Sequence, residues 1–375
     1  MRNINIFWNK YIFCAFFVFL PKVFYWEFAI FADMNKRIVF IMNPISGTSN
    51  KAGIPELIAN TLDTSLFDYE IKYTEHAGHA FELASEAKDN GADIVAAIGG
   101  DGTVNEVARA IVHSETALGI VPCGSGNGLA RHLLLPMQLK KSIELINHCQ
   151  IHELDYGIIN GHPFFCTCGM GFDAFVSMKF AEAGKRGPIT YAENILKEGL
   201  KYKPETYEIE DESGTMRYKA FLISCANASQ YGNNAYIAPQ ASMSDGLMDV
   251  IIMEPFDVIE APQISIDMFN KTLDKNSKIK TFKTKKLHIH RNEPGLIHYD
   301  GDPIMEGKDI EVEIKPKGIK IIVNPFADKS LRKPNALQTA ACELFNEINL
   351  LRDDIAKQGN KALAISKKLQ RKLNK

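Results

Sequence analysis

The sequence predicts an N-terminal α/β domain with a mainly parallel sheet, followed by a C-terminal antiparallel β-sandwich domain. Short apolar runs alternate with amphipathic segments as far as residue 150, a pattern typical of a parallel sheet covered by helices. From residue 151 onward, closely spaced strand-like runs follow one another with turn residues between them, which is typical of antiparallel sheets. The 375 residues suffice for two domains with ordinary hydrophobic cores.

The first domain is expected to alternate strands with helices. Short apolar runs predict strands over 37–42, 93–98 and 118–121, as in a parallel sheet that is buried on both faces. A fourth strand is expected over 69–73. Helices are expected where apolar residues recur at three- and four-residue steps, over 55–61, 78–90 and 103–112. Thr103 and Glu106 form a capping-box pattern, so Thr103 is expected to be the N-cap of the last of these helices.

The second domain is expected to consist mainly of strands. Apolar, β-branched and aromatic runs predict strands over 155–159, 207–211, 217–225, 247–253, 281–290, 296–299 and 309–314. Ser213-Gly214 separates two of these runs and predicts a hairpin. A helical or irregular insertion is expected over 175–202.

The two ends of the chain differ from the rest. Residues 1–33 form an apolar extension whose two blocks, 11–20 and 23–32, are each shorter than the roughly 20 residues that span a bilayer. We favour translation from Met34 over a weak membrane anchor as the explanation. Residues 326–375 are expected to form a helical C-terminal extension, because apolar residues recur there at alternating four- and three-residue steps. These apolar residues would form one face of the helix, which either pairs with a second copy in a homodimer or packs on the protein itself.

The overall composition restricts the function. The 43 basic and 45 acidic residues nearly cancel, so no nucleic-acid partner is expected. The seven cysteines are odd in number and lack paired zinc-type spacing. They are therefore expected to be reduced, mostly buried thiols of a cytoplasmic protein. His288, His290 and His298 lie on predicted strands, and their spacing favours solvent-facing histidines over metal ligands.

The stretch from Asp93 to Val112 predicts the chemistry. A buried strand leads into Gly99, Gly100, Asp101 and Gly102, and a helix follows. Glycines let the backbone approach a bulky anion, and the helix start directs free N–H groups at it. An aspartate beside such an anion is explained by an accompanying cation, with Mg²⁺ the first choice. The stretch therefore predicts a site for a nucleotide polyphosphate.

The segment GGDGTVNEV in this stretch resembles the signature of the diacylglycerol kinase catalytic domain, which bacterial lipid kinases and sphingosine kinases share. Residues 43–47 (NPISG) and 122–131 (PCGSGNGLAR) resemble two further segments of this family. In the second of these, Ser125 replaces a threonine and Gly128 replaces an acid. GFDA at 171–174 also matches, and the apolar run 318–325 is expected to return to the first domain, as the family's last strand does.

The resemblance implies roles for particular residues. The expected ATP-binding residues are Asn43, Pro44, Ser46, Gly47, Thr74, Gly99, Gly100, Asp101, Gly102, Thr103, Asn105, Glu106, Gly124, Ser125 and Asn127. Asn127 is in addition a candidate N-cap of the helix that follows it. A structural Mg²⁺ is implied at Ser242, Asp245 and Leu247, although an ordinary Asp-Gly turn is the alternative reading of that segment.

Asp300-Gly301-Asp302 resembles the family's DGE motif, which supplies the base for the lipid hydroxyl. Asp302 stands where the family has a glutamate. Asp302 or Asp300 is accordingly expected to accept the proton of the lipid hydroxyl, and Asp101 is expected to bind the magnesium-nucleotide.

The resemblance implies an ATP-dependent lipid kinase acting on diacylglycerol, a sphingoid base or a related lipid. Its nucleotide-binding domain is expected to comprise residues 34–150 and 318–325, and its lipid-substrate domain residues 151–317. A membrane lipid substrate implies a cytoplasmic enzyme in peripheral contact with the inner face of the membrane. The lysines between 275 and 286 form either a solvated face or a contact with anionic lipid. The alternatives are an NAD kinase-like enzyme and a non-catalytic lipid or nucleotide sensor.

Overall fold

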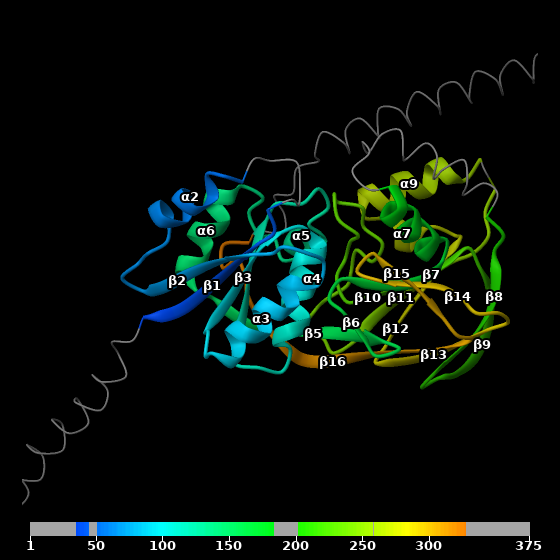
Figure 1. Cartoon of the computed structure of the whole chain (residues 1–375). Coiled ribbons are helices and arrows are strands. Elements are labelled where there is room, and N and C mark those ends of the chain that lie inside the picture. The colour runs from blue at the N-terminus through cyan, green and yellow to red at the C-terminus, as the bar shows by residue number, and fades with distance from the viewer. Residues whose placement is uncertain (1–34, 45–50, 184–201, 258, 328–375) are drawn as a thin grey trace, which may run out of the picture.

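The computed structural model describes residues 35–44, 51–183, 202–257 and 259–327. An α/β domain with a mainly parallel sheet lies beside a β-sandwich domain, as the sequence predicts (Figure 1). The apolar N-terminal extension lies outside the described residues, and so does the expected helical C-terminal extension from residue 328 onward. So do Ser46 and Gly47 of the first predicted nucleotide loop.

The first domain alternates strands and helices over 36–148. Its strands are β1 (Lys36–Met42), β2 (Phe67–Tyr73), β3 (Ile94–Gly99) and β4 (Ala117–Pro122). Its helices are α2 (Ile54–Thr61), α3 (His79–Asp89), α4 (Asp101–Ile111), α5 (Gly128–His132) and α6 (Leu139–His148). The strands lie in the order β2-β1-β3-β4 and pair in parallel. One apolar core joins α3 and α4 to one face of this sheet, and a second joins α2 and α6 to the other.

The second domain is built from two sheets. Its strands are β5 (Ile151–Ile159), β6 (His162–Phe164), β7 (Thr167–Gly171), β8 (Glu205–Asp211), β9 (Gly214–Ala220), β10 (Leu222–Ala226), β11 (Met248–Met253), β12 (Ile279–Thr284), β13 (Lys286–Arg291), β14 (Gly295–Tyr299), β15 (Asp302–Glu306) and β16 (Asp309–Ile322). Six of them form an antiparallel sheet in the order β12-β11-β10-β7-β14-β15. Helices α7 (Phe172–Ala183) and α9 (Ala261–Asn270) and a short 3₁₀ turn (Leu273–Lys275) complete the domain.

Strand β16 connects the two domains and appears in orange along the lower edge of Figure 1. Its first part pairs antiparallel with β13, and its last residues, Lys320 and Ile321, pair in parallel with β4. The predicted return of the chain to the first domain is therefore confirmed, but as the end of one long strand. Between Lys315 and Ile319 the pairing with β5 is irregular. The buried Asp155 carboxylate stabilises this irregularity, since it accepts hydrogen bonds from the Lys317 and Gly246 N–H groups at 2.8 and 2.7 Å.

Two predicted strands are wrong in extent because the chain changes sheets within them. The predicted strand 217–225 is β9 followed by β10, and the predicted strand 281–290 is β12 followed by β13; in both cases the two parts lie in different sheets. Strands that switch sheets at a corner are a feature of sandwiches. Neither segment contains a glycine or proline, so no turn residue marks either corner in the sequence.

The capping-box prediction is also wrong. Helix α4 begins at Asp101 with Gly100 as its N-cap, so Thr103 lies inside the first turn. Glu106 instead accepts hydrogen bonds from the Gly78 and Ala80 N–H groups, both at 3.0 Å. It therefore satisfies free donors at the start of the neighbouring helix α3, where a negative charge also favours the helix dipole.

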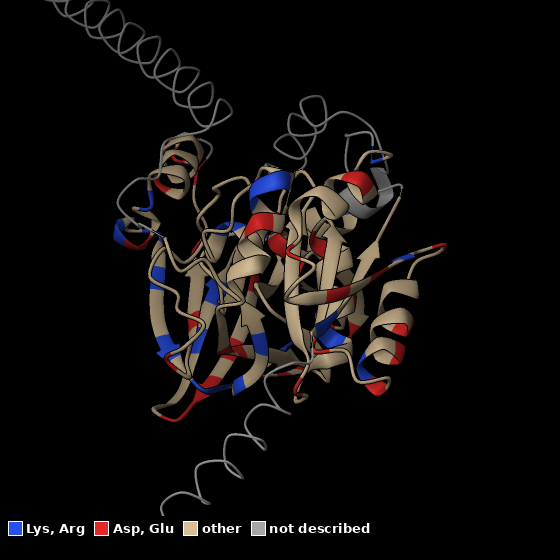
Figure 2. Ribbon diagram, turned by 90° about the vertical axis from the view of Figure 1, so that its left-hand side faces the viewer, with Lys and Arg blue, Asp and Glu red and all other residues tan. Residues whose placement is uncertain are grey.

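Charges of both signs are interspersed along the ribbon (Figure 2). Within the lysine-rich segment, Lys278 lies 3.4 Å from a Glu260 oxygen, and Lys286 lies 3.2 Å from a Glu311 oxygen. Part of that positive charge is thus balanced locally. The five cysteines of the described residues are free, and Cys166, Cys168 and Cys225 are buried, as predicted. Across the described part of the chain, none of the helices combines the length and apolarity needed to cross a membrane.

Candidate active site

The glycine-rich loops of the first domain meet at the carboxyl edge of its parallel sheet. The loop after β3 contacts the loop after β4 so closely that a Cβ on Gly124 would lie 2.6 Å from the Gly100 Cα. A Cβ on Gly99 would lie 2.5 Å from the Thr103 side chain. This edge is where ligands of open α/β sheets bind. The glycines are needed because no larger residue allows the two loops to touch.

Asp101 joins these two loops. Its Oδ2 accepts a hydrogen bond from the Asn127 N–H at 2.8 Å, and its Oδ1 accepts one from the Gly128 N–H at 2.6 Å. The carboxylate therefore caps the start of α5. Desolvation raises the pKa of Asp101, while the Gly128 and Asn127 N–H groups act in the opposite direction. Gly128, which stands where the family has an acid, contributes its backbone N–H to this contact.

Asn127 occupies the N-cap position of α5, but its side chain does not cap the helix. Its Oδ1 accepts a 2.9 Å hydrogen bond from the Gly124 N–H, and its Nδ2 donates a 2.7 Å bond to the Gly124 carbonyl. The side chain thus closes the loop on itself. Ser125 at the tip of this loop is exposed, so its hydroxyl is accessible to a ligand.

Several residues predicted to touch the nucleotide are buried behind the loops. Thr74, Thr103 and Asn105 belong to this group. The Thr74 N–H donates a 3.0 Å hydrogen bond to the Met42 carbonyl, and Asn43 Nδ2 lies 3.4 Å from Thr103 Oγ1. The Thr74 backbone and the Thr103 side chain therefore support the loop that follows β1.

Lys51 was not singled out by the sequence, because it follows the first loop without a motif of its own. It is buried, and its ammonium donates to the Asn43 carbonyl at the end of β1. Burial lowers its pKa. Lys51 places a cation among the loops, which suits an anionic ligand there.

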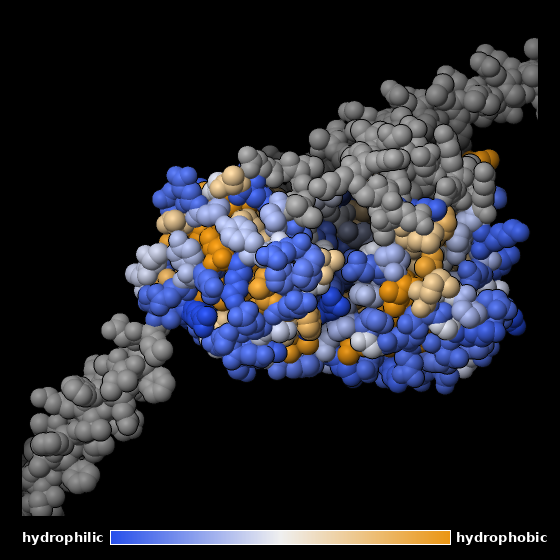
Figure 3. All heavy atoms as spheres, viewed as in Figure 1, coloured by the Kyte–Doolittle hydropathy of each residue, from blue (hydrophilic) through white to orange (hydrophobic). Residues whose placement is uncertain are grey.

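A pocket of about 370 Å³ opens between the two domains. The first domain contributes the start of α4 and α5, and the second contributes β7, β10, β14, α7 and α9. Seven of the seventeen lining residues have large apolar side chains: Val104, Leu129, Phe165, Phe172, Val176, Leu222 and Met268. Asp101, Asp173, His298 and Asp300 supply the charged or titratable groups. The surface drawn in Figure 3 is hollowed where the two domains meet.

Asp300 has its carboxylate saturated by N–H donors. Oδ1 accepts from the Cys166 and Thr167 N–H groups at 2.7 and 3.1 Å. Oδ2 accepts from the Phe165 N–H and from Asn105 Nδ2, both at 2.8 Å. Desolvation raises the pKa of Asp300, and the donors oppose that rise. A carboxylate held in this way positions the polypeptide, and it is poorly placed to take a proton from a substrate.

Asp302 is the first residue of β15, and it is exposed. Desolvation by the surrounding protein raises the pKa of Asp302, the Arg109 guanidinium lowers it, and the Glu106 carboxylate raises it further. Unlike Asp300, it accepts no hydrogen bond from the residues that the structure describes. Of the two candidate bases, Asp302 is the one with a free carboxylate.

The expectation that His298 faces solvent is wrong, because the residue is only 1% exposed. Its Nε2 lies 3.0 Å from Asp173 Oδ2, and the Gly301 N–H lies 3.4 Å from its Nδ1. Helix α7 covers this side of β14 and supplies Asp173, which belongs to the GFDA segment. The predicted position of that segment at the cleft between the domains is confirmed.

The predicted structural metal residues gather in one loop but do not fit a divalent cation. The Asp245 carboxylate lies 2.8 Å from the Lys283 ammonium, and its other oxygen accepts the Leu247 N–H at 3.1 Å. Lys283 is also 3.1 Å from Asp249. Ser242 Oγ lies 3.2 Å from Ser244 Oγ. The ammonium already balances the carboxylate, so a Mg²⁺ would have to displace it.

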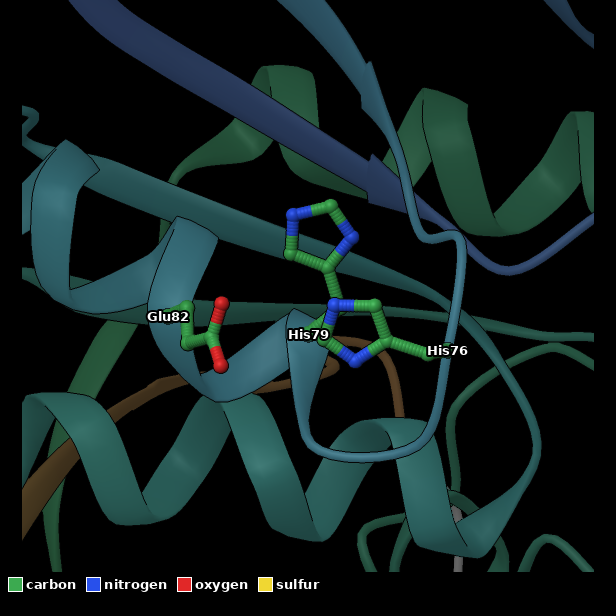
Figure 4. A group of neighbouring side chains, drawn as sticks. All are labelled: His76, His79 and Glu82. Atoms are coloured by element: carbon green, nitrogen blue, oxygen red, sulfur yellow. The ribbon is translucent and has the colours of Figure 1, made fainter.

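His76, His79 and Glu82 are a second group with metal-type ligands, and their donor atoms lie within 4.8 Å of one another (Figure 4). His79 Nδ1 accepts a 3.0 Å hydrogen bond from the Glu75 N–H, so the proton of the neutral ring lies on Nε2. His76 donates from Nδ1 to the Ala77 carbonyl. One imidazole nitrogen and one carboxylate then remain, which are fewer ligands than a zinc site requires.

Comparison with known proteins agrees with this geometry. A model of the diacylglycerol kinase catalytic domain matches residues 37–159, and a model of the YegS C-terminal NAD kinase beta sandwich-like domain matches residues 166–323. A "Probable lipid kinase YegS" of Escherichia fergusonii is 27% identical over 262 residues, which are 68% of this chain and 86% of that protein. A "Probable lipid kinase YegS-like" of Yersinia pestis is 25% identical over 74% of this chain and 94% of its own length.

Solved structures show the same fold. A diacylglycerol kinase from Bacillus anthracis superimposes with a TM-score of 0.61 at 20% identity, over 77% of this chain and 97% of that one. These structures share the two-domain fold, an α/β domain followed by a β-sandwich. The matched catalytic-domain model defines the class of the protein as a kinase. Within this class, the chain belongs to the YegS-like lipid kinase family, whose members contain the diacylglycerol kinase catalytic domain.

Proposed function

We propose that this protein is an ATP-dependent lipid kinase that transfers the γ-phosphate of ATP to a hydroxyl of diacylglycerol, a sphingoid base or a related lipid. The observation that supports this most is the position of the apolar pocket. It begins at Asp101, where the two glycine loops meet, and continues into the β-sandwich domain. Phosphoryl transfer requires the nucleotide and the acceptor hydroxyl to meet in line. In a pocket lined in this way, the hydroxyl of an apolar acceptor can lie next to the nucleotide phosphates.

The residues suit distinct roles in this reaction. The backbone N–H groups of the loops and the Lys51 ammonium are placed to bind phosphate oxygens. The Asp101 carboxylate offers more acceptor positions than its N–H donors occupy, so Asp101 fits the Mg²⁺ that accompanies ATP, and this cation would neutralise phosphate charge when bound. Asp302 is the proposed base for the lipid hydroxyl, and Asp300 positions the turn that presents it.

An NAD kinase-like enzyme is the second candidate, because the matched second-domain model is named for NAD kinase. The pocket lining argues against it. The polar ribose and phosphates of a dinucleotide acceptor would be desolvated against Val104, Phe172, Val176 and Leu222 without hydrogen-bond partners. A lipid acceptor gains free energy from the same side chains.

We also propose peripheral contact with the membrane, because the acceptor lipid resides there. Lys275, Lys280 and Lys285 of the lysine-rich segment are candidates for contact with anionic lipid, where each cation near the surface contributes about 1 kcal/mol. Vesicle sedimentation with and without anionic lipid measures this contact, and equal binding to both vesicles would contradict it.

The test of the proposed reaction uses ATP labelled in its γ-phosphate. Purified protein is incubated with a panel of lipids and, separately, with NAD, and the products are extracted into an organic phase. A lipid kinase gives labelled product that partitions with the lipid, an NAD kinase gives labelled product that remains in water, and a sensor gives neither. Either of the last two results would overturn the proposal.

A matched pair of glycine variants serves as the control for this assay. Gly124→Ala places a Cβ against the Gly100 backbone and should abolish transfer, because the two loops are forced apart. Gly307→Ala has open space around the added Cβ and should behave as the wild type.

A further inference from the structure

A buried polar network lies in the pocket on the side of the second domain. Asp173 Oδ2 accepts a 2.9 Å hydrogen bond from the Tyr231 hydroxyl, which also lies 3.2 Å from Ser224 Oγ. The same oxygen lies 3.0 Å from His298 Nε2, a contact whose angle falls short of a linear hydrogen bond. Asp173 is 9% exposed, and His298 and Ser224 are 1% and 0% exposed. The reaction as described above uses none of these groups.

Two polar atoms of this network remain available to bind a ligand. Asp173 Oδ1 accepts no hydrogen bond from the described residues, and His298 Nε2 is a buried donor without an aligned acceptor among them. Because the Gly301 N–H points toward His298 Nδ1, the proton of the neutral ring lies on Nε2. A carboxylate oxygen of the largely buried Asp173 and the buried His298 N–H therefore lie close together in a pocket with many apolar lining side chains. Leaving such groups unsatisfied is costly, so a ligand that satisfies both is favoured.

Gly169 shows that the chain makes room for this pair. A Cβ on Gly169 would lie 2.5 Å from Asp173 Oδ2 and 3.0 Å from His298 Nε2. Only glycine allows the helix α7 carboxylate and the β14 imidazole to approach each other over β7.

Tyr231 ties the network to the second glycine loop. A Cβ on Gly128 would lie 3.3 Å from the Tyr231 carbonyl carbon, and the Asn233 N–H donates a 3.1 Å hydrogen bond to the Gly126 carbonyl. The segment that carries Tyr231 thus packs on the loop predicted to bind the nucleotide. A head group bound at Asp173 is therefore held close to the phosphates.

We propose that Asp173 and His298 bind a second free hydroxyl of the acceptor lipid, one that is not phosphorylated. A hydroxyl donates to the Asp173 carboxylate and accepts from the His298 N–H, whereas an ether oxygen can only accept. The reacting hydroxyl must give its proton to the base, Asp302, so the bond at Asp173 belongs to another group. The preferred acceptor is therefore a lipid with two free hydroxyls near its head. This inference rests on the lipid kinase function proposed above.

The test compares 1-O-hexadecylglycerol, which has two free hydroxyls, with 1-O-hexadecyl-2-O-methylglycerol, which has one. Equilibrium binding of each labelled lipid in detergent micelles is measured by gel filtration in the presence of a non-hydrolysable ATP analogue. A hydrogen bond to a charged group corresponds to about ten- to a hundredfold in affinity. The wild type should prefer the diol by about that factor, and equal affinities would overturn the proposal. Binding does not depend on turnover, so absent phosphoryl transfer would refute the kinase function and leave this comparison valid.

Asp173→Asn should remove the preference. The Tyr231 hydroxyl keeps donating to the amide oxygen, so the amide nitrogen replaces Oδ1 and donates equally well to a hydroxyl or an ether. His298→Gln gives a second reading if the first variant fails to fold, since it removes the imidazole donor and should also reduce the preference. The exposed pair His290 and Asp309, 2.7 Å apart, supplies matched controls. Asp309→Asn and His290→Gln should retain the full preference. A preference that persists in both Asp173→Asn and His298→Gln would contradict the assignment.

Discussion

The Asn105 side chain donates a 2.8 Å hydrogen bond to Asp300 Oδ2 and so joins helix α4 of the first domain to the β14–β15 turn of the second. The same carboxylate holds three consecutive N–H groups at the start of β7. The Asp300 carboxylate, which lines the pocket, is thus hydrogen-bonded to groups of both domains. This contact fixes the turn that presents Asp302, which makes Asp300 a positioning residue.

Asp300→Asn should therefore destabilise the protein. The backbone at Asp300 has a φ of 48°, which asparagine also tolerates, so the change affects only the acceptor group. An amide NH₂ would face N–H donors, and the expected loss in the free energy of unfolding is about 1–3 kcal/mol. Urea unfolding measures it. If stability is unchanged while kcat falls a hundredfold, Asp300 is the base.

Asp302→Asn should lower kcat and leave the stability of the protein nearly unchanged. The residue is exposed and accepts no hydrogen bond from described residues, so the free energy of unfolding should change by less than about 0.5 kcal/mol. Loss of a general base typically lowers kcat by about 10²–10⁴-fold. The KM for ATP should stay close to that of the wild type, and Asp302→Glu should keep measurable activity. Steady-state kinetics on both variants decide the matter, and a near-normal kcat for Asp302→Asn would exclude Asp302 as the base.

The sequence alone predicted those features that depend on neighbours along the chain. Apolar spacing in 93–98 and 103–112 gave the central strand and helix α4 to within about two residues, because burial on a parallel sheet imposes that spacing. Asp302 became a candidate by a different route, because the DGD segment resembles a motif of the kinase family, and the resemblance of GGDGT supported Asp101. Sequence patterns suffice to predict elements whose contacts are made between residues close together along the chain.

Contacts between distant segments could not be predicted from one sequence. Asn105 and Asp300 are 195 residues apart, so nothing local shows that Asp300 is saturated. His298 was expected to face solvent because the pattern along β14 does not reveal that α7 covers one of its sides. Glu106 was assigned to its own helix, and its true partner is the neighbouring helix α3.

The pH dependence of kcat should report the environment of Asp302. A base must be deprotonated to act, and desolvation raises the pKa of Asp302, so the acid limb should lie above the ordinary aspartate value of about 3.9. The Arg109 guanidinium lowers this pKa, so Arg109→Gln should move the acid limb to still higher pH. Arg217→Gln, on the exposed face of β9, is the matched control and should leave the profile unchanged. A shift to lower pH in Arg109→Gln would contradict the assignment.

Asp101→Asn should affect both the loop and the nucleotide. In the structure Asp101 caps the start of α5 through the Asn127 and Gly128 N–H groups. Loss of a cap typically costs about 1 kcal/mol. We therefore expect a lower unfolding midpoint together with weaker ATP binding, measured by denaturation and by calorimetric titration. An unchanged midpoint with abolished ATP binding would restrict Asp101 to the nucleotide.

Removal of divalent cations should leave the stability of the nucleotide-free protein unchanged, because Lys283 balances Asp245 and Asp249. Desolvation raises the pKa of Asp249, and Lys283 opposes that rise. Lys283→Met removes the balancing charge. Since the Lys283 and Asp245 side chains are about a third exposed, the cost should be within about 1 kcal/mol, or a few degrees in Tm.

The same argument predicts that Mg²⁺ compensates for the lost ammonium, because it can then reach both carboxylates. Calorimetric scans with EDTA and with millimolar Mg²⁺ should coincide for the wild type and separate for Lys283→Met. Lys286→Met, whose Glu311 partner is well exposed, controls for the loss of a surface lysine and should show no response to Mg²⁺. A wild-type Tm that falls in EDTA would mean that a metal does bind at Asp245 and that Lys283 moves aside for it.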